Sequence, residues 1–211
     1  MLTMLRYPSL ALIAVAAALP FVPTRSARPT SDAMAADTVR PELWGVGVVS
    51  TAENELNAAF TADGRTVYFT RKGGDGRFAV ILESHLGRNG RWSTPAVSSF
   101  SGQYPDYDPI LTPNGQQLLY ISKRPVIGST PKSDFDIWVV DRTTTGWSAP
   151  RRLEAPINSD GDELYPSVAT DGTLYFSSCG RSDSKGRCDL YRSRLDGGRY
   201  TTPENLGGMV R

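Results

Sequence analysis

The sequence has few of the side chains that most often carry metal or nucleophilic chemistry. Its 211 residues include one histidine and two cysteines. A structural zinc site needs four Cys or His ligands, and His85 has no second histidine to pair with. The chain also lacks the G-x-S-x-G motif of a nucleophile elbow. We therefore predict no metal site, no cofactor and no catalytic nucleophile.

Charge of one sign is also lacking, since the formal net charge is +1 at pH 7. The positive excess falls in the first 35 residues, which hold Arg6, Arg25 and Arg28 against Asp32. The remainder is nearly balanced, so it has no electrostatic footprint for nucleic acid or an anionic membrane surface. We predict no nucleic-acid partner.

No apolar run is long enough for a bilayer-spanning helix, which needs about 20 residues. The longest run is LALIAVAAALPFV at 10–22; Arg6 precedes it and an A-x-A cleavage pattern lies at 33–35, with a weaker alternative at 24–26. This order is typical of a secretory signal peptide, here residues 1–36, and the alternative is an uncleaved anchor. We predict a periplasmic or secreted protein with no membrane span after cleavage.

The two cysteines fit an oxidising compartment. Cys179 and Cys188 flank a Gly/Ser-rich connection between two β-type runs. Export permits a disulfide, whereas two thiols without a nearby histidine do not make a zinc site. We predict a Cys179–Cys188 disulfide, with two free thiols as the alternative.

Three stretches of the chain repeat one pattern. They read ELNAAFTADGRTVYFTR from 55, DYDPILTPNGQQLLYIS from 106 and ELYPSVATDGTLYFSS from 163. Each places an acidic residue eight positions before Asp-Gly or Asn-Gly, and a β-type run follows. Asp-Gly or Asn-Gly between apolar runs predicts a β-hairpin with a type I′ turn.

A second pattern follows each hairpin. An apolar strand leads to an aromatic residue and, three positions later, to a proline; the pairs are Trp92 and Pro95, Trp147 and Pro150, and Tyr200 and Pro203. The third unit then has strands near 165–169, 173–178, 189–194 and 200–202. Four-stranded units at this period are typical of propeller blades, and proline fits an outer edge strand.

The copies resemble the WD40-like (PD40) repeats of TolB-type β-propellers. The third copy carries the resemblance most fully, through Glu163, Pro166, the Asp171-Gly172 pair and the Leu174–Phe176 and Asp189–Tyr191 runs. The resemblance implies an all-β chain of about three four-stranded blades of a six-bladed type. The boundaries are a lead-in with an outer strand at 37–52 and repeats at about 53–100, 104–156 and 160–208, within 53–211.

Three blades make an incomplete ring, because closed propellers typically have about four to eight. The chain is therefore either a truncated propeller or a half-ring that a second copy completes as a homodimer.

Acidic residues gather where each blade begins. In a propeller the innermost strands line the central channel, so these positions are predicted to converge at one mouth; they are Glu55, Asp106, Asp108, Asp162 and Glu163. Such carboxylates suit Ca²⁺, sugar hydroxyls or a basic peptide, although nothing singles out Ca²⁺. The alternative is that they cap turns. Arg124 with Asp136, and Arg181 with Asp189, flank a hairpin at matching positions and are predicted to form structural ion pairs or turn contacts.

The function that follows is an exported, non-catalytic β-propeller module that binds a protein, peptide or glycan. The first alternative is a carbohydrate-active enzyme of glycoside hydrolase or lyase type, using the acidic rim. The second is a truncated propeller with no independent function. The sequence does not identify the ligand.

Overall fold

The computed structural model describes residues 41–74, 78–128 and 130–207. The predicted signal peptide, residues 1–36, lies outside them. Every element below belongs to one unit that begins at Glu42.

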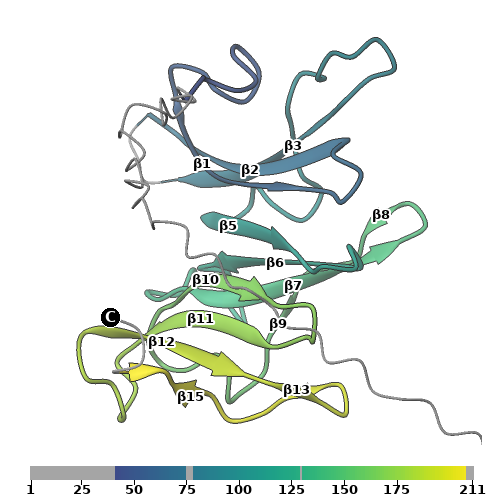
Figure 1. Cartoon of the computed structure of the whole chain (residues 1–211). Coiled ribbons are helices and arrows are strands. Elements are labelled where there is room, and N and C mark those ends of the chain that lie inside the picture. The colour runs from purple at the N-terminus through teal and green to yellow at the C-terminus, as the bar shows by residue number, and fades with distance from the viewer. Residues whose placement is uncertain (1–40, 75–77, 129, 208–211) are drawn as a thin grey trace, which may run out of the picture. The chain divides into compact units, whose positions relative to one another are not determined.

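The chain forms three successive antiparallel sheets, each a meander of four main strands (Figure 1). Blade 1 comprises β1 (Asn54–Phe60), β2 (Thr66–Lys72), β3 (Ala79–His85) and β4 (Ala96–Val97). Blade 2 comprises β5 (Asp106–Leu111), β6 (Gln117–Ser122), β7 (Asp136–Thr143), β8 (Gly146–Trp147) and β9 (Arg151–Arg152). Blade 3 comprises β10 (Glu163–Val168), β11 (Leu174–Cys179), β12 (Cys188–Ser193) and β15 (Glu204–Asn205), with a side hairpin of β13 (Leu195–Asp196) and β14 (Arg199–Tyr200). The prediction of an all-β chain of propeller blades is confirmed.

The fourth strand of blade 3 lies later in the chain than predicted. In blade 3 the strand that pairs with β12 is β15, whereas Tyr200 lies in the β13–β14 hairpin. This hairpin turns at Gly197-Gly198, where both residues have positive φ, so the chain leaves the sheet before it returns. Pro95, Pro150 and Pro203 each directly precede the short strand that pairs back, where a missing N–H costs no ladder bond.

The predicted type I′ turns are wrong in type although the hairpins form. Only the glycine of each pair has positive φ, at Gly64, Gly115 and Gly172. In blade 1 four residues lie between Thr61 and Thr66; the Gly64 amide donates to the Thr61 carbonyl at 2.8 Å and the Thr61 amide donates to the Thr66 carbonyl at 2.9 Å. The blade 3 loop, closed by Ala169 and Thr173, is one residue shorter. Such loops are built around a type I turn that ends in a left-handed residue, so the residue before glycine needs no positive φ.

The core lies between the sheets, because alternate residues of the second and third strands point to opposite faces. One cluster joins blades 2 and 3, with Leu119, Val139, Leu174, Phe176 and Tyr191 among its members. A second joins blades 1 and 2.

A third cluster covers the other face of blade 1. Val49, with Val48 beside it, packs on Val67, Phe69 and Leu82. Residues 41–52 hold turns and a bridge between Val46 and Ser50 where an outer strand is predicted. No helix of the described residues is long and apolar enough to cross a membrane.

Candidate functional site

The innermost strands β1, β5 and β10 share an unusual backbone feature. Each has a register shift against its neighbour, at Leu56/Ala59, Tyr107/Ile110 and Leu164/Ser167. Within each shift one non-glycine residue has left-handed φ: Asn57 at 50°, Asp108 at 55° and Tyr165 at 52°. These residues occupy the same position of the repeat, and a bulge of this kind redirects a side chain. Asn tolerates the left-handed region, whereas for Tyr it is strained.

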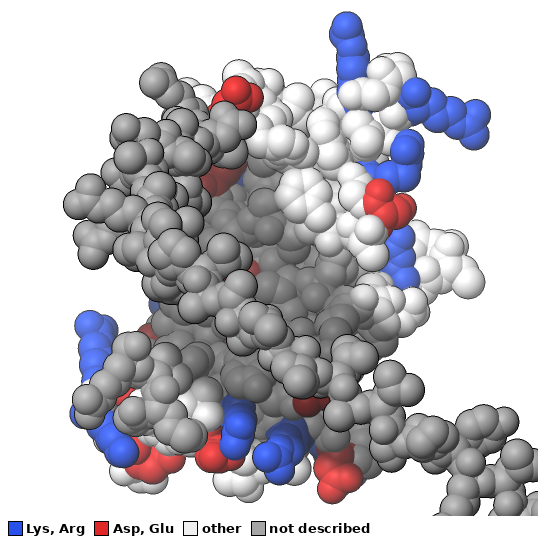
Figure 2. Space-filling view, viewed as in Figure 1, with Lys and Arg blue, Asp and Glu red and all other residues white. Residues whose placement is uncertain are grey.

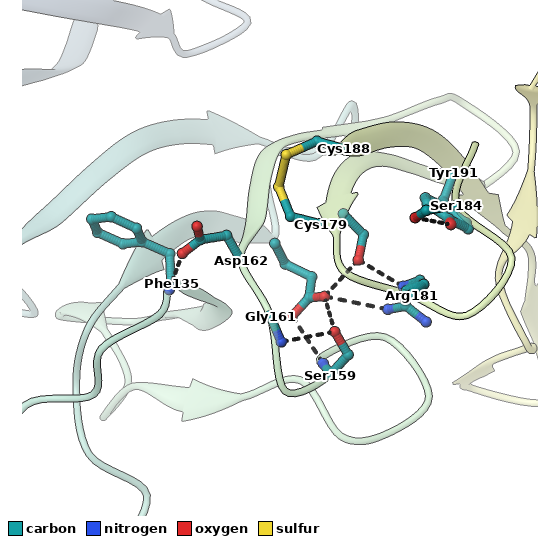
Figure 3. The surroundings of a disulfide bond; sticks show 11 residues. Phe135, Ser159, Gly161, Asp162, Cys179, Arg181, Ser184, Cys188 and Tyr191 are labelled. Carbon is teal, nitrogen blue, oxygen red and sulfur yellow. Dashed lines mark hydrogen bonds and ion pairs between the residues drawn. A yellow bond between two sulfur atoms is a disulfide. The ribbon is translucent and has the colours of Figure 1, made fainter. Parts of the chain in front are cut away.

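The acidic residue two positions earlier is held by its own blade. Glu163 is fully buried and accepts hydrogen bonds from the Ser159 amide (2.9 Å), the Ser159 hydroxyl (2.6 Å) and the Ser178 hydroxyl (2.8 Å). Arg181 adds an ion pair at 3.4 Å, as Figure 3 shows beside the Cys179–Cys188 disulfide. Burial raises the pKa of the Glu163 carboxyl, and these bonds offset part of that rise.

The two counterparts of Glu163 are held similarly. Asp106 is fully buried and accepts from the Ser101 hydroxyl at 2.7 Å, and burial raises its pKa. Glu55 pairs with Arg71 at 3.0 Å. Burial raises the pKa of Glu55, but hydrogen bonds from Thr51 and the Arg71 charge outweigh it, so the pKa lies below its usual range. All three carboxylates secure the turn that leads into their blade.

Asp108 links the three blades. Its carboxylate accepts a hydrogen bond from the Asn57 side-chain amide of blade 1, and the Tyr165 backbone amide of blade 3 lies near enough to lower its pKa. Its own amide donates to the Thr70 hydroxyl of blade 1 at 3.1 Å. Because Asp108 is only 6% exposed, desolvation raises the pKa of its carboxyl to about 6. The repeated left-handed position therefore brings the three inner strands to one carboxylate.

The predicted rim residues thus fall into different environments. Asp106 and Glu163 are buried in their own blades, Glu55 is mostly covered, and Asp108 lies between the inner strands. Asp162 accepts from the Phe135 backbone amide at 2.9 Å, which ties blade 3 to blade 2.

Sequence reasoning missed Asn57, while Tyr165 was interpreted either as a stacking surface near the acidic residues or as packing. The signal for both was their alignment with Asp108 in the repeat.

The predicted ion pairs of Arg124 and Arg181 are wrong. Arg181 pairs with Glu163, and Asp189 accepts from the Asn205 side chain at 3.0 Å. Asp136 pairs instead with Arg152, at 2.7 Å, on the strand beside it. Arg181 and Asp136 therefore pair with other groups of opposite charge, and Asp189 accepts from a side-chain amide.

Two exposed side chains are neighbours of this point on the inner strands. Tyr165 is 64% exposed, and Leu56, which precedes Asn57, is 40% exposed. We call Asn57, Asp108, Tyr165 and Leu56 the inner-strand surface. Figure 2 shows blue and red side chains interspersed along the lower edge, where β12, β13 and β15 lie, in keeping with the balanced composition.

Two further predictions concern metals and disulfides. Cys179 and Cys188 form a disulfide, as predicted. In the part of the chain that the structure describes, no group of three or more His, Cys, Asp or Glu side chains is arranged to hold a metal ion.

No family model matches the sequence. No curated protein matches it either. Among solved structures, the chain is similar to a protein from Agrobacterium tumefaciens described as a TolB, with 19% identity over 72% of this chain and 49% of that one and a TM-score of 0.47. It is also similar to the hydrazine synthase of Kuenenia stuttgartiensis (14% identity, 72% of this chain, 25% of that one, TM-score 0.48). It is similar, too, to an α-L-arabinofuranosidase of Clostridium thermocellum (13% identity, 75% of this chain, 56% of that one, TM-score 0.39). The chain spans about half or less of the first two, and the blade assignment above rests on strand order and register.

Proposed function

We propose that this chain is an exported, non-catalytic binding module that recognises a protein, peptide or glycan at the inner-strand surface. The observation that carries the proposal is the exposed Tyr165, which has a left-handed backbone conformation and lies beside the Asp108 carboxylate. Strained backbone persists where the surrounding structure imposes it, and it is a reason to look for function. A large aromatic beside a carboxylate and an amide offers both a stacking face and hydrogen-bonding groups.

The environment of the carboxylates favours binding over catalysis. Glu163 accepts hydrogen bonds within its own blade through its carboxylate, Asp106 accepts one from Ser101, and both carboxylates lie away from solvent. The exposed groups of the inner-strand surface are aromatic, aliphatic and amide side chains. Such a surface orients a ligand by contact and hydrogen bonding.

The proposal is tested by screening the full chain against a random-peptide library and a glycan array. We expect hits of one class, and we expect Tyr165→Ala to weaken them at least about tenfold, as loss of a buried aromatic contact does. Phe78→Ala is the matched control, since Phe78 is a 40% exposed aromatic that precedes β3 rather than lying on an inner strand. Hits that Phe78→Ala weakens and Tyr165→Ala leaves unchanged would refute the proposal.

One observation favours a second candidate, a carbohydrate-active enzyme. A carboxyl with a pKa of about 6 resembles the raised pKa of a general acid in glycoside hydrolysis. Against it, the Asp108 carboxylate is 6% exposed and accepts a hydrogen bond from Asn57 of its own fold. Turnover of glycan hits by the wild-type chain, abolished in Asp108→Asn, would establish this candidate and exclude binding alone.

A periplasmic or secreted location and a homodimer that completes the ring belong to the same proposal. The disulfide supports an oxidising compartment, where such bonds persist. The dimer is supported by apolar side chains on the outward face of blade 3, argued in the Discussion. A chain that stays folded yet binds nothing on either array would favour the remaining alternative, a truncated propeller without independent function.

A further inference from the structure

The repeat allows the two junctions between blades to be compared at equivalent positions. At the junction of blades 1 and 2, the β8 residue Trp147 folds back on Tyr68 of blade 1. The ring centroids lie 5.9 Å apart, and the Trp147 indole N–H donates to the Tyr68 hydroxyl at 3.2 Å. Phe100 packs edge-on against Trp147. The hollow that remains there measures about 400 Å³.

The junction of blades 2 and 3 lacks this aromatic pair. The position of Tyr68 is occupied by Leu119, and the position of Trp147 by Tyr200 on the β13–β14 hairpin. Both replacements are smaller side chains. The hollow between the hairpin and blade 2 accordingly measures about 700 Å³, within the range of roughly 300–1,000 Å³ that ligand pockets occupy.

The lining of this larger cavity is divided by polarity. Its floor is apolar and buried, formed by Leu119, Val139, Leu153 and Ile157. Its rim carries polar groups, which are Gln117, Arg151, Glu154, Arg199 and Tyr200.

The rim carries two arginines, Arg151 and Arg199, against one carboxylate, Glu154, so positive charge is in excess there. Arg151 is paired loosely with Asp141, at 3.3 Å and half exposed. Arg199 is exposed, and the ion pairs among the described residues do not include it. Burial raises the pKa of the Tyr200 hydroxyl, and the nearby Arg151 charge offsets part of that rise. A guanidinium presents a planar set of donors that matches a carboxylate.

We propose that the cavity bounded by Leu119 and the β13–β14 hairpin binds a small amphipathic anion, an apolar chain or ring that ends in a carboxylate. The apolar part lies on the floor of the cavity, and the carboxylate meets Arg199 and Arg151 at the rim. This site is separate from the inner-strand surface and does not depend on the function proposed there.

Calorimetric titration of the full chain with decanoate tests the proposal, and 1-decanol serves as the uncharged probe. We expect saturable decanoate binding that Arg199→Gln weakens about tenfold, the effect of losing one charge-assisted hydrogen bond. Arg194→Gln is the matched control, because Arg194 is an exposed arginine that directly precedes the hairpin and does not line the cavity.

The repeat also supplies a variant that fills the cavity. Leu119→Tyr combined with Tyr200→Trp copies the pair of the first junction, and it should abolish decanoate binding. Ala155→Trp fills the cavity from an exposed position on its rim. This second variant tests the cavity even if the double variant does not fold. The proposal is overturned if decanoate does not bind the wild-type chain, if Ala155→Trp binds it unchanged, or if 1-decanol binds as tightly as decanoate.

Discussion

At the residue scale, the acidic residue that begins each repeat has a structural role. Glu55, Asp106 and Glu163 each accept from a serine or threonine four or five positions earlier, which fixes the turn that enters the blade. Glu163 and Glu55 also pair with an arginine. The sequence pattern located these residues correctly at the start of the inner strands. It could not show that they turn into the sheet, because burial depends on partners that lie 15 to 18 positions away.

Glu163→Gln is expected to destabilise the fold by about 2 kcal/mol. Gln keeps one acceptor but loses a charge-assisted bond and leaves Arg181, which is only 14% exposed, without its counter-charge. Burial raises the pKa of Glu163 because its charged form is desolvated. Removing that charge offsets part of the lost unfolding free energy. Urea unfolding at pH 7 measures the change.

Glu204→Gln is the matched control for this substitution. Glu204 pairs with Arg192 at 2.9 Å, but both side chains are well exposed, so the loss should stay below about 1 kcal/mol. Equal losses for the two substitutions would contradict the structural role of Glu163.

Asp108 is expected to make stability depend on pH between about 4 and 6. Its pKa is about 6 in the folded chain and about 3.9 when unfolded, so the folded state binds the proton more tightly. The stabilisation is fully present below pH 4 and is lost as pH rises through 6, by about 3 kcal/mol at most. Asp108→Asn cannot titrate, so the difference in unfolding free energy between variant and wild type should change across this interval. A difference that is constant from pH 4 to 7 would show that Asp108 has an ordinary pKa.

At the element scale, the sequence predicts strands well and their connections less well. The runs ending in Phe69, Tyr120 and Phe176 formed the expected second strands, because alternation and β-branched or aromatic residues report directly on strands. The fourth strand of blade 3 was misplaced, because the pairing of Arg192 with Glu204 depends on how far the intervening hairpin leaves the sheet. The left-handed Tyr165 could not be predicted, since Tyr has no preference for that conformation.

The Cys179–Cys188 disulfide closes the connection between the elements β11 and β12. Cys179 and Cys188 are opposite each other in the register of the two strands. Replacing both by Ser should lower stability by about 2–3 kcal/mol, the chain-entropy value for so short a loop. The midpoint of urea unfolding, with and without dithiothreitol, measures this. Dithiothreitol should lower the wild-type midpoint and leave that of the double variant unchanged; an equal effect on both would contradict the prediction.

At the scale of the whole molecule, the outer face of blade 3 favours association with a second copy. Tyr191 points toward blade 2, so by alternation Leu190 and Arg192 point the opposite way, and Leu190 is 38% exposed. Blade faces of this kind pack on a further blade in a closed propeller. We expect sedimentation equilibrium to give twice the mass of one chain, and Leu190→Asp to reduce that mass to the monomer. A wild-type monomer at all concentrations would contradict the half-ring.

Hydrogen–deuterium exchange of the full chain, with and without a ligand selected on the arrays, tests the inner-strand surface most directly. The account predicts added protection in β1, β5 and β10, centred on Asn57, Asp108 and Tyr165. Protection confined to the outer strands β4, β9 and β15, with the inner strands unchanged, would contradict it.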